Sequence, residues 1–296
     1  REVMAALAPH TGKAHVIGLT GSPGVGKSTS TSALVAAFRA RGKRVGILAV
    51  DPSSPFSGGA LLGDRVRMQE HALDPEVYIR SMASRGHLGG LAWTTPQAIR
   101  VLDAAGCEVV LVETVGVGQS EVEIAGLADT TIVLLAPGMG DGIQAAKAGI
   151  LEIGDVFVVN KADHPLTETM VREIRGVLSL APAGGWQVPI VRTEAHRGVG
   201  LDDLVTRLDE HRAFIEAEGT LGERRRRNLH SEILSICMHR MRRTLEATLA
   251  QDPASATLLD RVPHRHQDPD PDATQILRSA GQSGNGSGRG PHGDSG

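Results

Sequence analysis

The sequence predicts an α/β fold in which a mainly parallel sheet carries helices on both faces. Apolar runs of strand length alternate with stretches of helical periodicity, as expected of successive strand–helix–strand units. The expected strands are 15–20, 44–50, 108–112, 131–136, 155–160 and 188–192, and the expected helices are 27–41, 94–105, 143–152, 166–180 and 201–217. In such a sheet ligands bind beyond the carboxyl ends of the strands, where the polar motifs of this chain also fall.

A glycine-rich loop joins the first expected strand to the first expected helix. Its glycines let backbone N–H groups turn toward phosphates, and the helix directs its positive end to the same place. Lys27 would reach the β- and γ-phosphates, and Ser28 would ligate Mg²⁺. A strand, this loop and a helix in register predict a P-loop NTPase. The residues expected to bind the nucleotide here are Gly21, Ser22, Pro23, Gly24, Val25, Gly26, Lys27, Ser28 and Thr29.

The apolar run 109–112 delivers a carboxylate, Glu113, at the end of another expected strand. Glu113 can hold Mg²⁺ directly or through water. Three residues later, Gly116 can offer its N–H to the γ-phosphate, so that one loop senses whether the third phosphate is present. The alternative is a buried strand that simply ends in a solvated glutamate.

A third motif follows the expected strand 155–160 and indicates which base is bound. The carboxylate of Asp163 can accept hydrogen bonds from N1–H and the amino group of guanine, whereas adenine would leave it unpaired. Lys161 would lay its methylene stem against the base, and Asn160 would brace the loop. The alternative is an ordinary helix-capping loop, but its place downstream of the phosphate loop favours GTP over ATP.

These residues resemble the MeaB/ArgK family of P-loop GTPases, which includes the methylmalonic aciduria type A protein. The resemblance covers the chain from about His15 to Arg212. It implies a GTPase chaperone for an adenosylcobalamin-dependent methylmalonyl-CoA mutase or a related acyl-CoA mutase, which gates cofactor loading and protects the mutase. The cobalamin itself would be held by the partner. The matching segments are 21–29, 49–54, 58–68, 86–90, 113–121 and 160–163.

The resemblance also implies roles for residues between the motifs. The glycine-, serine- and proline-rich stretch 51–63 would be a switch loop, in which Asp51 orders the attacking water or the metal shell. Asp64 would join the Mg²⁺ shell. For both aspartates the alternative is a helix or turn cap.

A third switch would lie at 138–147, where Gln144 and Lys147 approach the γ-phosphate. The alternative for Lys147 is a side chain that merely covers its helix. Val117 follows Gly116 where Ras-like enzymes have their water-orienting glutamine, so intrinsic hydrolysis is expected to be slow.

Ala195 matches the small residue that GTPases often place beside the guanine. The residue before it, Glu194, replaces the usual serine. This departure puts the fine geometry of the guanine loop in doubt, but not the contact from Asp163.

Composition favours a cytoplasmic enzyme that binds neither nucleic acid nor membrane. The net charge of −3 gives no attraction to polyanions, and aromatic residues make up only 2% of the 296 residues, too few for base-stacking platforms. No apolar run approaches the length that spans a membrane. Cys107 and Cys237 lack metal-ligand spacing and indicate reduced cytosolic thiols.

Three regions are expected along the chain: a GTPase domain over 1–218, a helical arm over 219–262 and a disordered tail over 263–296. Residues 223–250 contain no glycine or proline and carry an apolar stripe. The arginines of this segment, 224–227 among them, are interpreted as a solvated helix face. The segment resembles the dimerisation arm of the family, which implies a homodimer.

Two other functions remain open on the sequence. The first is a metal-delivery GTPase of the nickel-insertion kind, hinted at only by His264 and His266. The second is a transport-linked ATPase or kinase, against which the guanine motif argues.

Overall fold

The computed structural model describes the backbone of residues 2–52, 68–84, 94–114, 123–138, 151–180 and 185–251. Contacts divide the chain into two compact units, Arg1–Ser231 and Glu232–Gly296. The predicted boundaries at 218 and 262 are not tested by this division and stay predictions.

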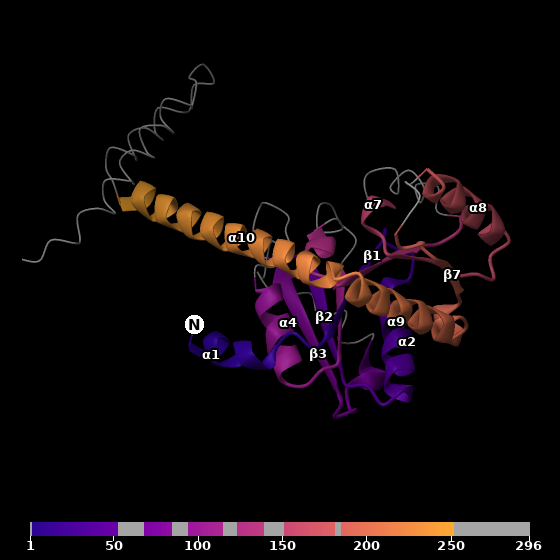
Figure 1. Ribbon diagram of the computed structural model, residues 1–296, viewed down its shortest axis with the longest axis horizontal. Helices are drawn as coiled ribbons and strands as arrows, with labels where there is room; N and C mark the ends of the chain where they lie inside the picture. Colours follow the sequence, from indigo (N-terminus) through magenta and orange to yellow (C-terminus); the bar gives the residue numbers. More distant parts are fainter. Residues whose placement is uncertain are drawn as a thin grey trace, which may run out of the picture. The chain divides into compact units, whose positions relative to one another are not determined.

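A seven-stranded sheet forms the centre of the first unit (Figure 1). The strand order is β3-β2-β4-β1-β5-β6-β7, and each neighbouring pair is parallel. This confirms the predicted fold class. The strands are β1 (His15–Thr20), β2 (Val45–Pro52), β3 (Val77–Ser84), β4 (Val109–Thr114), β5 (Thr130–Leu135), β6 (Val156–Asn160) and β7 (Ile190–Thr193).

Strand β3 was not predicted, because its sequence has no continuous apolar run. It lies at the edge of the sheet and pairs only with β2 among the described strands. Its side chains alternate between half-buried Val77 and Ile79 and exposed Tyr78 and Arg80. Val77 and Ile79 pack against the core cluster on one face of the sheet and Met82 against the cluster on the other, but exposed polar residues interrupt them, so the hydrophobic signal of β3 is weaker than that of a central strand.

The α-helices are α1 (Glu2–Leu7), α2 (Lys27–Ala40), α4 (Thr95–Ala104), α7 (Leu151–Ile153), α8 (Thr167–Leu178), α9 (Leu201–Ala217) and α10 (Thr220–Gln251). Helices were expected where α2, α4, α8, α9 and α10 lie, whereas α1 was not predicted. Short 3₁₀ turns are η1 (Ala8–His10), η2 (Gln69–His71), η3 (Ile124–Gly126) and η5 (Ala195–Arg197). Of the helix expected over 143–152, residues 143–150 lie outside the described ranges.

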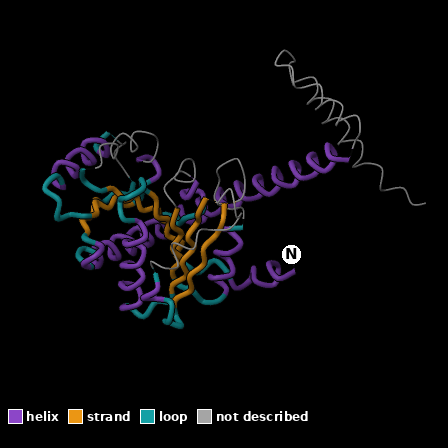
Figure 2. The backbone as a smooth tube through the Cα atoms, turned by 180° about the vertical axis from the view of Figure 1, so that it is seen from behind, coloured by secondary structure: helices purple, strands orange, loops and turns teal. Residues whose placement is uncertain are grey.

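Helices cover both faces of the sheet, as Figure 2 shows. On one face, α2 and α9 pack through residues such as Phe38 and Leu208 against alternate residues of the central strands. On the other face, α4 packs against β2 and β4, and α8 packs against β5 and β6. Both faces of the inner strands are therefore buried, which explains why these strands are continuously apolar in the sequence.

Helix α10 begins in the first unit and continues into the second. A helix was predicted here from the apolar stripe and is present. In the second unit the described residues belong to this helix, and several of its large apolar side chains are exposed, among them Ile233, Leu234, Met238 and Met241. None of the described helices combines the length and apolar character needed to cross a bilayer. The predicted tail, 263–296, lies outside the described residues.

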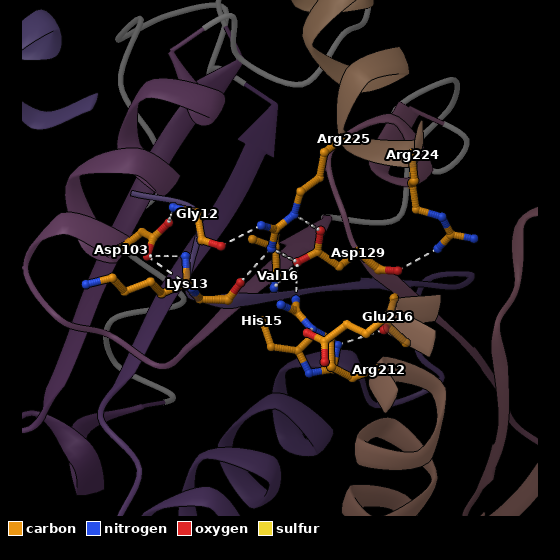
Figure 3. A network of polar contacts seen from close by, with 12 residues as sticks. Gly12, Lys13, His15, Val16, Asp103, Asp129, Arg212, Glu216, Arg224 and Arg225 are labelled. Carbon is orange, nitrogen blue, oxygen red and sulfur yellow. Dashed lines mark hydrogen bonds and ion pairs between the residues drawn. The ribbon is translucent and has the colours of Figure 1, made fainter. Parts of the chain in front are cut away.

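Buried aspartates hold together the edge of the sheet where the strands begin (Figure 3). Asp129 precedes β5 and accepts the N–H of Val16 at 3.0 Å, while Asp155 precedes β6 and accepts the N–H of Thr131 at 2.8 Å. Asp103, in the last turn of α4, accepts N–H groups of the chain entering β1. Each carboxylate satisfies backbone donors that the sheet leaves unpaired.

Two arginines of α10 form ion pairs with two of these carboxylates, Asp129 and Asp155. Arg225 lies 2.7 Å from Asp129, and Arg224 lies 2.7 Å from Asp155. Both arginines are partly buried, with side-chain exposures of 30% and 26%. The interpretation of residues 224–227 as a solvated face is therefore wrong for these two. Charge periodicity cannot show this, because the partners are isolated aspartates far away in the sequence.

The same edge contains a buried chain of polar side chains. His15 Nε2 lies 2.7 Å from the Thr130 hydroxyl, which lies 2.8 Å from Nδ1 of His211. His211 Nε2 lies 3.2 Å from Asp155. Burial lowers the pKa of His15 to about 3, so this ring is neutral.

Asp155 should contribute stability that is lost in acid. Burial alone would raise its pKa, but hydrogen bonds from Arg224 and His211 outweigh burial and lower the pKa to about 2. Because the unfolded chain binds the proton more tightly, this contribution is present above about pH 4 and lost as the pH falls toward 2. We expect Asp155→Asn to cost roughly 2–3 kcal/mol at neutral pH, since Arg224 loses its counter-charge.

Urea unfolding at pH 7 and pH 3 measures this loss. Glu168→Gln is the matched control, because the Glu168–Arg192 pair is exposed and its loss should matter little. Equal stabilities of Asp155→Asn and the parent at pH 7 would contradict the assignment.

Candidate active site

The loop between β1 and α2 is built on glycines that no other residue can replace. Gly26 caps α2 with a φ of 95°, and a Cβ there would lie 2.5 Å from Nδ2 of Asn160. Gly21 has a φ of 144°, and its Cβ would lie 2.3 Å from the carbonyl oxygen of Leu134. Both positions therefore exclude a side chain through backbone conformation and through contact.

Lys27, the first residue of α2, folds back over this loop. Its ammonium group donates to the carbonyl oxygen of Gly21 and, at 3.1 Å, to that of Ser22. The side chain is only 8% exposed. The positive charge of Lys27 therefore lies within the loop, next to the N-terminus of α2, where an anion is favoured.

Glu113 and Ser28, which the sequence singles out as candidate metal ligands, lie together. The Ser28 hydroxyl donates to one oxygen of Glu113 at 2.7 Å, and the Thr31 hydroxyl lies 2.9 Å from the other. Glu113 is only 2% exposed. A hydroxyl and a carboxylate at the end of a phosphate loop are hard oxygen donors, which suit Mg²⁺. Thr31 was not singled out in the sequence, although its position one helical turn after Lys27 places it on the same face.

Asp51 lies at the same edge of the sheet by register. Ala49 of β2 pairs with Glu113 of β4, so Asp51 stands two residues beyond that pair. Its side chain is outside the description, and its role stays a prediction. The other predicted residues of the switch regions, Asp64, Gly116, Gln144 and Lys147, lie outside the described ranges.

Asn160 joins three segments at the end of β6. Its Nδ2 donates to the carbonyl oxygen of Val25 at 2.9 Å. Its Oδ1 accepts from the Thr193 hydroxyl and from the N–H of Ala195, each at 3.1 Å. The side chain is 4% exposed, so all of these contacts are shielded from water. The predicted bracing role of Asn160 agrees with this geometry.

Lys161 and Asp163 follow on the same loop. Lys161 adopts a left-handed backbone with a φ of 56°, and its ammonium group donates to the carbonyl oxygen of Gly24 at 3.0 Å. Its methylene stem thus spans from the loop that follows β6 to the phosphate loop. Asp163 is exposed to solvent, where its carboxylate is accessible to a base.

The departure at Glu194 does not displace the loop that follows β7. Glu194 and Val199 form an antiparallel bridge, and Glu194 is paired with Arg197 at 2.9 Å. Ala195 remains buried and donates its N–H to Asn160. The loop is held through its backbone, so its position does not depend on a serine at 194.

A groove of about 740 Å³ runs along the outer side of α2. On one side, η2 is attached to the helix, because His71 Nε2 lies 2.9 Å from the Ser32 hydroxyl, which also donates to Glu70. The sequence did not single out these three residues, which are distant along the chain. Among the described residues, no cluster of three or more His, Cys, Asp or Glu is arranged to hold a metal. The groove is lined by Ser28, Thr29, Ala33, Ala36, Ala195, His196, Leu201 and Asp202 as well.

Comparison with solved structures supports the same fold. The chain superposes on the crystal structure of a LAO/AO transport system kinase with a TM-score of 0.66, covering 95% of this chain and 85% of that one. The sequences are 24% identical, so this similarity establishes the fold alone.

Sequence relatives extend the comparison. A protein of Pyrococcus abyssi, provisionally named a GTPase, is 45% identical over 282 residues, which cover 94% of this chain and 87% of that protein. The mitochondrial methylmalonic aciduria type A homolog of Mus musculus is 38% identical over 214 residues, which cover 71% of this chain and 52% of the mouse protein.

The family model described as methylmalonyl-CoA mutase-associated GTPase MeaB matches residues 1–250. This match spans the phosphate loop, Glu113 and the Asn160 loop. The chain therefore belongs to the MeaB family of P-loop GTPases, whose fold implies a bound guanine nucleotide.

Proposed function

We propose that this GTPase acts on an adenosylcobalamin-dependent methylmalonyl-CoA mutase, or a related acyl-CoA mutase, as a chaperone that gates cofactor loading and protects the enzyme. The family name supports a mutase as partner, and so does the name of the mouse relative. The observation that carries the GTPase chemistry is the contact between Ser28 and Glu113 at the start of α2, where the preceding residue, Lys27, places its ammonium group against the carbonyl oxygens of the glycine loop.

Hydrolysis is proposed to proceed by attack of water on the γ-phosphorus, with cleavage of its bond to the bridging oxygen and release of GDP and phosphate. Lys27 and the N–H groups from Gly24 to Thr29 would bind the phosphate oxygens. Ser28 and Glu113 would hold Mg²⁺, directly or through water. When bound, Mg²⁺ neutralises part of the charge on the phosphates. Asp64 is proposed to complete this metal shell.

Water positioning is assigned to the switch residues. Asp51, Gln144 and Lys147 are proposed to order the attacking water and the charge around the γ-phosphate, and Gly116 is proposed to sense the γ-phosphate through its N–H. Val117 stands where Ras-like GTPases carry a glutamine. A partner that orders these loops would therefore accelerate a slow intrinsic reaction. Cobalamin is proposed to be held by the mutase.

Base recognition is assigned to Asp163. Its exposed carboxylate would accept N1–H and the amino group of guanine, while Lys161 and Ala195 flank the ring. The contact from Lys161 to Gly24 supports this arrangement, because it holds the base loop next to the phosphate loop.

The arm is proposed to make the protein a homodimer. Leu234, Met238 and Met241 follow one another at spacings of four and three, which places them on one helix face. All three are more than half exposed. Soluble proteins rarely leave contiguous apolar faces uncovered, so a second copy of the arm is the proposed cover.

Asp163→Asn should weaken guanine nucleotide binding by roughly 1–3 kcal/mol or more, because the carboxylate pairing is lost. It should also shift the preference toward xanthine nucleotides, whose carbonyl matches the new amide. Calorimetry with GDP, XDP and ADP measures both effects. Asp203→Asn, an exposed change on α9, is the control and should behave like the parent. Equal affinity of the parent for GDP and ADP would refute the assignment.

Charges on the arm should separate the dimer. We expect Met238→Glu with Met241→Glu to convert a dimer into a monomer, because two carboxylates would enter the apolar face. Arg243→Glu, on the opposite face of the helix, is the control and should leave the dimer intact. Light scattering on the full chain distinguishes these outcomes. A monomeric parent protein would rule out the proposed dimer.

The mutase should stimulate hydrolysis at least several-fold in single-turnover measurements, because it orders the switch loops. Lys147→Ala should reduce this stimulation and leave GDP affinity nearly unchanged. Lys43→Ala, an exposed lysine at the opposite edge of the sheet, is the control and should keep full stimulation. A fast basal rate that the mutase does not alter would count against the chaperone function.

A further inference from the structure

We propose that Thr31 is a positioning residue that orients the carboxylate of Glu113 for the metal. The inference rests on the proposed function, since it concerns the Mg²⁺ that Ser28 and Glu113 would hold. Thr31 lies outside the glycine loop and is not expected to touch the nucleotide.

The geometry divides the two oxygens of Glu113 between two hydroxyls of one helix. Ser28 contacts Oε1 at 2.7 Å, and Thr31 contacts Oε2 at 2.9 Å. The two residues are three positions apart on α2, so their side chains lie on the same face. The carboxylate is thereby held at both ends.

The Thr31 hydroxyl has two acceptors within reach but only one proton. It lies 3.0 Å from the carbonyl oxygen of Lys27 and 2.9 Å from Oε2 of Glu113, a carboxylate that is ionised when it holds a metal. Hydrogen bonds to an ionised acceptor are roughly twice as strong as those between neutral groups. Donation to Glu113 is therefore favoured over the bond to the Lys27 carbonyl.

A threonine suits this role in two ways. Its branched Cβ restricts χ1, so the hydroxyl is held in place before it binds. The side chain is fully buried, so water cannot replace the hydroxyl if it is removed. Glutamate has one more rotatable bond than aspartate, and fixing Oε2 removes the freedom that this bond would give to Oε1.

The test is the Mg²⁺ dependence of GDP binding in Thr31→Val, which keeps the shape of threonine and lacks the hydroxyl. We expect the half-saturating Mg²⁺ concentration to rise about tenfold or more, as is typical when a residue behind a metal ligand is lost. GDP affinity in EDTA should stay within about twofold, because Thr31 does not contact the nucleotide. Thr31→Ser, which keeps the hydroxyl and lacks the branch, should restore most of the parent Mg²⁺ dependence.

Thr206→Val is the matched control. The Thr206 hydroxyl makes the same bond to a carbonyl four residues earlier, at 2.8 Å, on helix α9. It has no carboxylate partner among the described residues, so its loss should leave the Mg²⁺ dependence unchanged. Fluorescent GDP titrated with Mg²⁺ gives the readout for all variants, without any measurement of hydrolysis.

The outcomes separate the inference from the proposed function. A parent protein that binds no guanine nucleotide would overturn the proposed function. A parent that binds GDP with Mg²⁺, together with a Thr31→Val protein of unchanged Mg²⁺ dependence, would overturn the role of Thr31 alone. If Thr31→Val loses as much GDP affinity in EDTA as it does with Mg²⁺, the inference is also overturned, since Thr31 would then support the glycine loop rather than the metal. If Thr31→Val does not fold, Thr31→Ala provides the same comparison.

Discussion

The buried carboxylate of Glu113 constrains the whole nucleotide end of this protein. A charge placed at 2% exposure is costly unless hydrogen bonds satisfy it. The described partners are hydroxyls of α2, so the helix must begin where Ser28 and Thr31 can both reach β4. That requirement fixes the start of α2, and the start of α2 fixes where the glycine loop must turn.

Buried carboxylates have different partners at the two ends of the strands. Where the strands begin, Asp129 and Asp155 are paired with arginines, which are permanent cations and lower the pKa of both groups after burial alone would raise it. Where the strands end, the two oxygens of Glu113 accept hydrogen bonds from the hydroxyls of Ser28 and Thr31. The carboxylates at the strand starts thus form ion pairs between elements of the fold, whereas the carboxylate of Glu113 is contacted by hydroxyls in the first turns of α2, next to the glycine loop.

The sequence predicted those features that depend on local patterns. The central strands and the glycine loop carry strong local signals, and they lie where they were expected. Strand β3 was not predicted, because exposed polar residues interrupt its apolar ones. Arg224 and Arg225 were misassigned because their aspartate partners are distant in sequence. Thr31 was missed for the same reason, since its function depends on the strand packed against its helix. Local patterns specify elements, whereas contacts between elements require the fold.

Asn160 connects the glycine loop to the loop that follows β7. Its amide group is hydrogen-bonded to Val25 of the phosphate loop and to Ala195 in the loop that follows β7. Gly26 approaches the same amide so closely that a Cβ would not fit between them. A shift of either loop would therefore break a buried hydrogen bond, which costs more than an exposed one. Beyond the end of β5, a Cβ at Gly138 would lie 3.2 Å from Nε2 of His164, which belongs to the loop that follows β6. The loop that follows β6 thus contacts the phosphate loop through Asn160 and Lys161, and through His164 it lies next to Gly138.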